Sequence, residues 1–167
     1  MYSFAKRNVL LDKDEYRINI KSRNIGFDAE IIEPNIIEEN NDIKIPPATL
    51  KRILKLQPNL VIIPDAGTNS AKWENEILDN NIDLTIIDHH DPTNEVCKRA
   101  IIVNNTMNRL DCNVNLSGTG VTFKVLQALD MDMNTKYSNN FIDLVGLSII
   151  SDSMDVRTYE NRWYRKS

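Results

Sequence analysis

The sequence contains only two cysteines and no long apolar segment. Cys97 and Cys112 show neither metal-ligand nor disulfide spacing, which argues against a disulfide scaffold and fits a reducing compartment. No apolar run approaches the roughly 18 residues that a membrane-spanning helix needs. The first seven residues are polar and mixed, and they lack the apolar stretch of a secretory signal. We therefore expect a cytoplasmic chain with no membrane partner.

The chain also lacks an excess of basic charge. It has 20 Lys and Arg residues against 24 Asp and Glu residues, which gives a net charge of −4. Affinity for nucleic acid would therefore need a local basic strip, a bound metal or another domain. The 167 residues are 41% hydrophobic and 26% charged, which is a globular composition. A domain of this length buries roughly 70% of its unfolded surface and needs no disulfide to hold a core.

Short apolar runs alternate with amphipathic stretches, without an internal repeat or a low-complexity linker. We predict strands over 8–11, 27–32, 60–63, 84–87 and 101–103, and helices over 14–24, from Pro46-Pro47 onward, after Asn69, over 120–129 and over 141–151. The strand segments are continuously apolar, which indicates that both of their faces are covered. The alternation predicts an α/β fold, a doubly wound, mainly parallel sheet with helices on both faces. In such sheets ligands bind beyond the carboxyl ends of the strands.

Side chains that can bind metal follow three of the predicted strands. Asp12 and Asp14 follow 8–11, Asp65 follows 60–63, and Asp88, His89 and His90 follow 84–87. A further carboxylate, Asp152, comes at the end of the predicted helix 141–151. Because the carboxyl ends of parallel strands meet at one edge of a sheet, we expect these groups to converge there. Carboxylate and imidazole ligands without cysteine suit Mn²⁺, Mg²⁺, Fe²⁺ or Zn²⁺, and they argue against structural zinc.

Each of these residues has an ordinary structural alternative. An aspartate after a strand is most often a turn former or a helix cap. Adjacent histidines in a loop are usually exposed polar residues. The convergence of several such residues at one edge favours a metal site over these alternatives.

Four segments between residues 60 and 162 carry a further pattern. They are VIIPDAGTN at 61–69, IIDHH at 86–90, LSGTGVTFK at 116–124, and DLVG at 143–146 with ISD at 150–152 and ENR at 160–162. In this order and spacing they resemble the motifs of the DHH phosphoesterase superfamily, most closely its RecJ-like branch of single-strand exonucleases. The resemblance covers residues 60–162 well and the first 59 residues poorly.

The departure from the superfamily lies in its first motif, which is of the Asp-x-Asp-Gly type. The counterpart in this sequence is Asp12-Lys13-Asp14-Glu15, in which Glu15 stands where the family has glycine. A side chain at that position would crowd the metals, because the glycine lets the next helix start close to them. Two interpretations stay open. Either the motif is degenerate, or Asp12 and Asp14 only imitate it as acidic residues of a loop and a helix N-terminus.

The resemblance implies two divalent metal ions, Mn²⁺ or alternatively Mg²⁺. Asp65 would bridge the two metals. His89 and Asp152 would complete the coordination of one metal, and Asp12 and Asp14 would hold the other. The implied catalytic set is Asp65, His89, His90 and Asp152.

The resemblance also implies contacts around the substrate phosphate. Asp88 would orient an imidazole, and His90 would stabilise charge on the scissile phosphate. Ser117 and Gly118 open a helix whose free N–H groups could bind a phosphate, although Ser117 could equally be an ordinary N-cap. Arg109 could grip a phosphate, and its alternative is a solvated surface side chain.

The activity implied by the resemblance is metal-dependent phosphodiester hydrolysis by the DHH domain of an exonuclease acting on single-stranded DNA. One alternative is a phosphoesterase for small substrates, such as a short oligonucleotide, a cyclic dinucleotide or pyrophosphate. A second alternative is a catalytically inactive binding module. Family members continue into a DHH-associated domain that grips the substrate. We therefore expect residues 1–167 to be a single DHH-type catalytic domain and a fragment, with its substrate-binding domain absent or supplied by a separate chain.

Overall fold

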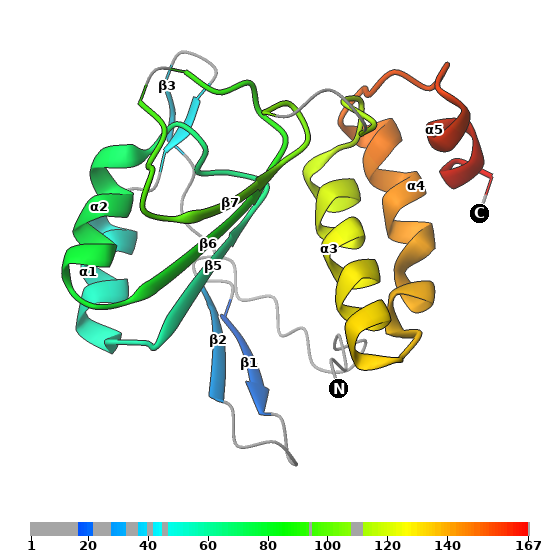
Figure 1. Ribbon diagram of the computed structural model, residues 1–167. Helices are drawn as coiled ribbons and strands as arrows, with labels where there is room; N and C mark the ends of the chain where they lie inside the picture. Colours follow the sequence, from blue (N-terminus) through cyan, green and yellow to red (C-terminus); the bar gives the residue numbers. More distant parts are fainter. Residues whose placement is uncertain are drawn as a thin grey trace.

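The computed structural model describes residues 17–21, 28–32, 37–39, 42–44, 47–93, 95–107 and 112–166. A three-stranded parallel sheet contains β5 (Leu60–Pro64), β6 (Asp83–Asp88) and β7 (Ile101–Asn104), in the order β5-β6-β7. The register places Asp88 beside Asn104. The carboxyl ends of all three strands therefore lie at the same edge of the sheet (Figure 1).

Helices α1 (Pro47–Leu56) and α2 (Ala71–Asp79) lie against one face of this sheet (Figure 1). Proline is tolerated in the first turn of a helix, so α1 can begin at Pro47. The core on this face consists of buried aliphatic side chains from α1, α2, β6 and the turn before β6. They are Leu50, Ile53, Ile77, Ile82, Leu84 and Ile86. Every second residue of β6 thus points toward these helices, as the pleat of a strand requires.

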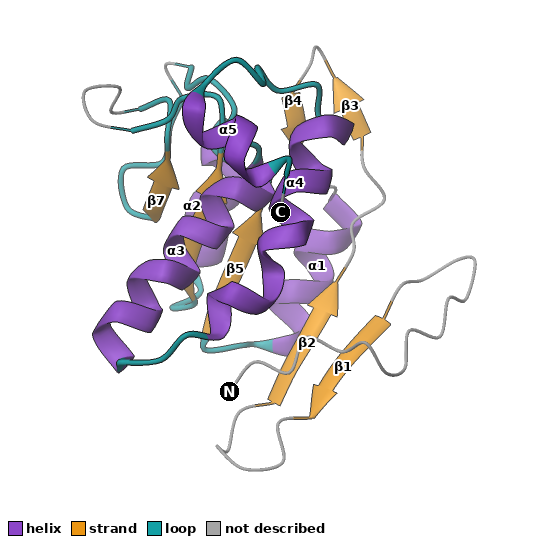
Figure 2. Cartoon of the chain, turned by 90° about the vertical axis from the view of Figure 1, so that its right-hand side faces the viewer, coloured by secondary structure: helices purple, strands orange, loops and turns teal. Residues whose placement is uncertain are grey.

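A second group of helices contains α3 (Gly118–Met133), α4 (Ile142–Ser151) and the short α5 (Tyr159–Tyr164) (Figure 2). Their core is also aliphatic and aromatic. It consists of Ile87, Leu116, Val121, Phe123, Val145, Ile149 and Tyr164. Ile86 packs with α1 and α2, whereas the next residue, Ile87, packs with α3 and α4. The fold is therefore α/β, with helices on both faces of a parallel sheet, and this prediction is confirmed.

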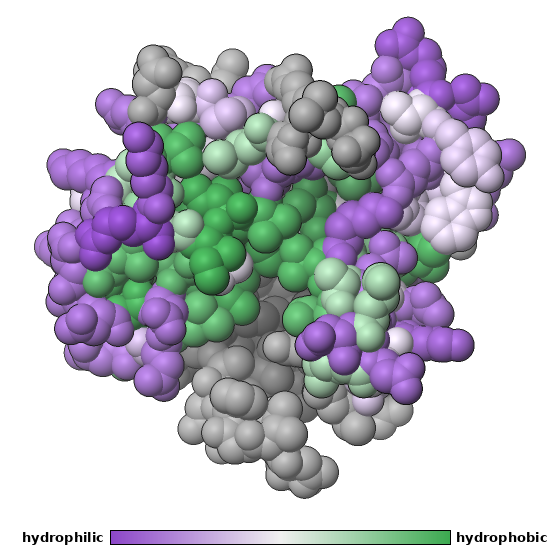
Figure 3. Space-filling view, in the orientation of Figure 1, coloured by the Kyte–Doolittle hydropathy of each residue, from purple (hydrophilic) through white to green (hydrophobic). Residues whose placement is uncertain are grey.

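Coverage of the second face is incomplete among the described residues. Leu60 and Ile62 of β5 and Ile101 of β7 are 48%, 53% and 66% exposed. Figure 3 shows an apolar surface in the middle of the molecule, between the two groups of helices. The strands are therefore covered on the face that packs against α1 and α2. On the other face they are covered only near their carboxyl ends, so the expectation of full coverage holds only in part.

The N-terminal region differs from the prediction. Strand β1 (Arg17–Lys21) occupies part of the predicted helix 14–24 and pairs antiparallel with β2 (Asp28–Ile32). The helix prediction was wrong because Arg-Ile-Asn-Ile-Lys alternates polar and β-branched residues, and this period of two favours a strand. A second antiparallel pair joins β3 (Ile37–Glu39) and β4 (Asp42–Lys44). The predicted strand 8–11 lies outside the described residues.

The boundaries of two helices also differ from the prediction. The residue before α2 is Ser70, whereas the side chain of Asn69 bonds the backbone of Asp91 and Thr93 instead of capping the helix. Helix α3 begins at Gly118, two residues earlier than predicted, because Ser117 is its N-cap. Among the helices of the described ranges, none is long and apolar enough to cross a membrane.

Candidate metal centre

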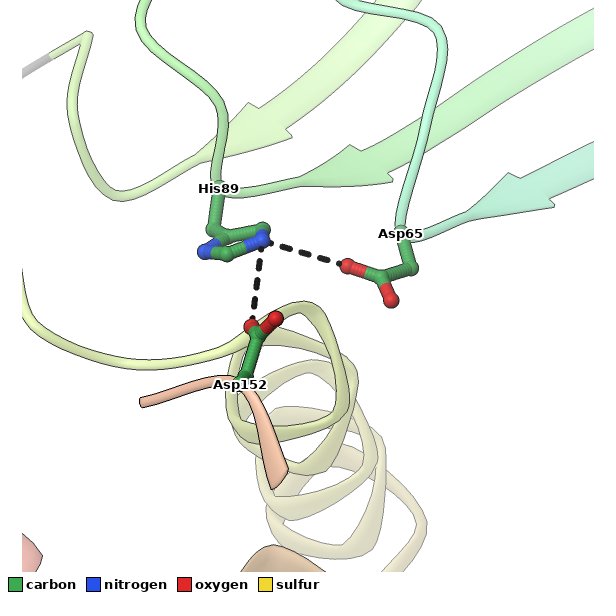
Figure 4. Close-up of side chains that lie close together, drawn as sticks. All are labelled: Asp65, His89 and Asp152. Carbon is green, nitrogen blue, oxygen red and sulfur yellow. Dashed lines mark ion pairs between the residues drawn. The ribbon is translucent and has the colours of Figure 1, made fainter. Parts of the chain in front are cut away.

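Three of the predicted ligands converge at the carboxyl edge of the sheet. His89 Nε2 lies 3.3 Å from Asp65 Oδ1 and 3.4 Å from Asp152 Oδ2 (Figure 4). Asp65 follows β5, His89 follows β6, and Asp152 follows the last turn of α4. Three segments far apart in the sequence thus bring one imidazole and two carboxylates to a single point.

The turn after β5 aims Asp65 at this point. Asp65 has a positive φ of 61°, a left-handed conformation that a short polar residue adopts more readily than most. Its backbone N–H donates a hydrogen bond of 2.8 Å to the carbonyl oxygen of Ile87 in the neighbouring strand. Unusual backbone conformations of this kind concentrate at functional sites. The conformation and the bond together fix where the Asp65 side chain begins.

The first turn of α3 lies directly against Asp65. A Cβ atom added at Gly118 would come within 1.9 Å of Asp65 Oδ1, so only glycine fits at this position. The amino end of a helix carries partial positive charge, which favours a carboxylate nearby. Ser117 caps the helix by accepting a hydrogen bond from the Gly120 N–H, and its hydroxyl also contacts Ser148 of α4 at 2.7 Å. This cap holds the start of α3 in place against the site.

Asp88 belongs to a different contact network from the other two carboxylates. It is 1% exposed, and its Oδ1 lies 2.7 Å from His90 Nδ1 while accepting a bond of 2.8 Å from the His89 N–H. Burial alone would raise the pKa of Asp88, but hydrogen bonds from His90 and Thr68 outweigh it and hold the pKa well below its usual range. The same bond from Asp88 raises the pKa of His90, against the opposing effect of burial. Asp88 therefore stays ionised and orients His90.

The electrostatics of the convergent group favour a bound cation. Burial raises the pKa of Asp65, the nearby His89 lowers it and the carboxylate of Asp152 raises it again, with a net upward shift. Burial, the largest cause of this shift, disfavours the charged carboxylate, and positive charge beside it would favour that form. A divalent ion between Asp65 and Asp152 would supply that charge.

The two distances from His89 also fit one metal ion. Ligand atoms of Asp65, His89 and Asp152 all lie within 4.8 Å of one another. Metal–ligand bonds of about 2.1 Å place two donors at most about 4.2 Å apart, and the two distances measured from His89 fall inside that limit. Two carboxylates and one imidazole suit Mn²⁺, Fe²⁺, Zn²⁺ or Mg²⁺. These residues can therefore hold a divalent metal.

The other predicted site residues divide into two groups. Asp12, Asp14 and Arg109 lie outside the described residues. Ser117 and Gly118 lie beside the centre, Ser117 as the N-cap of α3 and Gly118 against Asp65, and their contact with a phosphate stays a prediction.

Two polar residues near the centre were not identified from the sequence. Thr68 and Asn104 both contact the loop that carries His90, directly or through Asp88. Thr68 lies in the turn after β5, and Asn104 is the last residue of β7. Both therefore lie near strand ends, as the predicted ligands Asp65 and His89 do. A search of every strand end for polar side chains, and not only for metal ligands, would have found them.

Comparison with known proteins decides the family. The sequence model of the DHH family, N-terminal domain, matches residues 1–149. The chain belongs to the DHH family. The match confirms the resemblance to this family that the sequence indicated.

Two curated relatives match part of this chain. The protein YorK of the SPbeta prophage in Bacillus subtilis (strain 168), named as a single-strand DNA-specific exonuclease, is 36% identical over 106 residues. That match covers 64% of this chain and 18% of the relative, and YorK of Bacillus phage SPbeta gives the same figures. The chain thus spans about a fifth of the length of these relatives.

Solved structures show the same fold. The crystal structure of exonuclease RecJ bound to manganese superposes with a TM-score of 0.64 at 21% identity, covering 75% of this chain and 31% of that one. RecJ from Thermus thermophilus in complex with Mn²⁺ gives a TM-score of 0.62 at 22% identity, covering 71% and 18%. The chain therefore shares its fold with part of RecJ.

Proposed function

We propose that this DHH domain hydrolyses phosphodiester bonds of single-stranded DNA in a metal-dependent reaction. The observation that carries the proposal is the convergence of Asp65, His89 and Asp152 at the carboxyl edge of the sheet. The relatives named as single-strand DNA-specific exonucleases support the choice of substrate. The absence of a membrane-spanning helix among the described residues agrees with a cytoplasmic location, which we also propose.

Asp65, His89 and Asp152 would hold the metal. When bound, the ion polarises a phosphate oxygen and helps a water molecule to lose its proton. Attack of the water oxygen on phosphorus would form one P–O bond while the bond to the leaving sugar oxygen breaks. The water proton would go to solvent, and the leaving oxygen would take up a proton from solvent. We propose Mn²⁺ as the ion, because both matching RecJ structures contain manganese, with Mg²⁺ as the alternative. We further propose a second ion held by Asp12 and Asp14, with Asp65 bridging the two.

His90 is suited to act on the phosphate. Its Nδ1 bonds to Asp88, so Nε2 is the ring nitrogen left for a substrate. The raised pKa of His90 increases its protonated fraction at neutral pH, and protonated imidazole donates from both nitrogens. A charged donor beside a phosphate oxygen stabilises the charge that develops there in the transition state. His90 would therefore contribute to turnover more than to metal binding.

Substrate grip is the weak part of this chain. A net charge of −4 gives no long-range attraction for a polyanion. The chain corresponds to 18% of the length of YorK, so binding energy from the remaining length of such a relative is not present in these residues. We therefore propose that tight binding of DNA needs a further domain, in the same protein or on a separate chain.

The test is hydrolysis of a labelled single strand and of a small phosphodiester by the purified chain with Mn²⁺, beside Asp65→Ala. We expect slow hydrolysis of the small substrate, weak and non-processive cleavage of the strand, and no hydrolysis by the variant. Rapid processive digestion by the parent, lost in Asp65→Ala, would show that the chain needs no further domain. Hydrolysis of neither substrate, with no Mn²⁺ bound, would contradict the proposal and favour the inactive binding module. Hydrolysis confined to short oligonucleotides, cyclic dinucleotides or pyrophosphate would favour the small-substrate alternative.

A further inference from the structure

A chain of hydrogen bonds behind the metal centre connects the ends of all three parallel strands. Asn104, at the end of β7, donates from Nδ2 to Thr68 Oγ1 at 2.9 Å and to the carbonyl oxygen of His90 at 2.8 Å. Thr68, in the turn after β5, donates its backbone N–H to Asp88 Oδ2 at 3.0 Å. Asp88, at the end of β6, bonds His90 Nδ1. The chain thus runs from Asn104 through Thr68 and Asp88 to His90.

The direction of each bond in this chain can be assigned. Asn104 Oδ1 accepts the N–H of Thr106 at 2.7 Å, and a backbone N–H can only donate, so the other amide atom of Asn104 is the NH₂ group. That group donates to Thr68 Oγ1, so the Thr68 side chain ties Asn104 to the turn whose backbone N–H bonds Asp88 Oδ2. Asp88 Oδ1 accepts the backbone N–H of His89 and Asp88 Oδ2 accepts that of Thr68, so both carboxylate oxygens act as acceptors. We therefore assign the hydrogen between Asp88 and His90 to His90 Nδ1.

Burial makes these assignments restrictive. Thr68 is 0% exposed and Asp88 is 1% exposed, so water cannot easily replace a missing partner. A buried carboxylate that loses a donor suffers a desolvation penalty and tends to reorient toward other donors. The Asp88 oxygens would then no longer be held at the angle that suits His90 Nδ1.

We propose that Thr68 and Asn104 are positioning residues for His90. They hold Asp88 so that His90 Nδ1 donates to it in the neutral ring as well as in the protonated ring. Nε2 is thereby left free of Asp88 and donates to a substrate phosphate when the ring is protonated. The two residues also tie the turns after β5 and β6 to the end of β7. The role of Nε2 toward a phosphate rests on the function proposed above. The protonation pattern of His90 does not depend on that function and can be measured without substrate.

The protein offers a clear spectroscopic test because its sequence contains only two histidines. Long-range ¹H–¹⁵N spectra of ¹⁵N-histidine-labelled, tag-free protein report which ring nitrogen of each neutral imidazole carries the hydrogen. His90→Ala assigns the two sets of signals. In the parent we expect neutral His90 to be the Nδ1–H form. In Thr68→Val, which keeps the shape and removes the hydroxyl, we expect that form to lose its dominance, whereas Thr68→Ser keeps the parent pattern.

A matched control separates this effect from a general loss of stability. Thr135 donates a hydroxyl hydrogen bond to the carboxylate of Asp130, which also accepts backbone N–H groups, and Thr135 lies away from the centre. Thr135→Val should leave the His90 signals unchanged. With a small phosphodiester as substrate, Thr68→Val should lower kcat about tenfold, which is the smaller end of the activity losses seen when a residue that supports a site residue is replaced. KM and Mn²⁺ affinity should change little.

The result that would overturn the proposal is a folded Thr68→Val protein whose His90 signals match the parent. If Thr68→Val does not fold, Asn104→Ala decides, since it removes the donor to Thr68 from a partly exposed position. Parent-like His90 signals in Asn104→Ala would equally refute the proposal. Failure of the parent to hydrolyse any phosphodiester would refute the proposed function and would leave this spectroscopic result intact.

Discussion

Replacing Gly118 with alanine should weaken the metal centre without touching a ligand. The new Cβ atom would lie 1.9 Å from Asp65 Oδ1, and an ordinary contact begins at 3.4 Å, so the oxygen must move by 3.4 − 1.9 = 1.5 Å. Rotation of the side chain alone cannot relieve the clash, because Asp65 Cβ would also lie only 2.7 Å away. Metal ligands tolerate displacements of only about 0.2 Å. We expect Mn²⁺ affinity to fall at least about tenfold, and overpacking to cost about 1–3 kcal/mol of unfolding free energy.

The assay is calorimetric titration with Mn²⁺, with a thermal melt showing that each protein is folded. Gly120→Ala is the matched control, since its Cβ would meet only Leu116, at 3.1 Å, and no ligand. Small movements of Leu116 relieve that contact, so the control should bind Mn²⁺ like the parent. A folded Gly118→Ala protein with the parent's Mn²⁺ affinity would refute the reasoning that α3 sets the position of Asp65.

Three further predictions follow from the centre and its supports. His89→Ala should lose Mn²⁺ because it removes a ligand, whereas His90→Ala should keep Mn²⁺ and lose turnover; equal loss of Mn²⁺ in calorimetric titrations of both variants would contradict these separate roles. The pKa of Asp65 is raised, and metal binding competes with its proton, so Mn²⁺ should be released on acidification at a higher pH than with an ordinary carboxylate ligand. Mn²⁺ titrations over a pH series and a ¹³C titration of Asp65 in the metal-free protein check this, and an Asp65 pKa at its ordinary value would disprove it. Gly146→Ala should lower the free energy of unfolding by about 1–3 kcal/mol, since its Cβ would lie 2.5 Å from the Tyr164 carbonyl oxygen; an unchanged midpoint in urea would show that α4 and α5 can separate at no cost.

The convergence of the candidate ligands was predictable because two of them follow parallel strands. Asp65 and His89 directly follow apolar strands, and parallel strands have a fixed direction, so their convergence follows from topology. Asp152 follows an apolar helix, and its place beside His89 is confirmed by a distance of 3.4 Å. The α/β architecture follows from the same alternation of strands and helices.

Other features depend on close approach in space, which spacing along the chain does not reveal. Thr68 and Asn104 lie 36 residues apart, and their bond exists because β7 pairs with β6 in one particular register. The restriction at Gly118 comes from the approach of α3 to Asp65, not from a local turn.

The strand at Arg17–Lys21 was taken for a helix, although its alternation of polar residues and isoleucine was visible in the sequence.

The central claim is that Asp65, His89 and Asp152 share a divalent metal. The direct measurement is an anomalous difference map from a crystal of the protein grown with Mn²⁺, with data collected on either side of the manganese absorption edge. The account predicts a manganese peak about 2.0–2.3 Å from His89 Nε2 and from one carboxylate oxygen each of Asp65 and Asp152. A map with no peak among these three side chains, or with manganese bound only elsewhere, would contradict it.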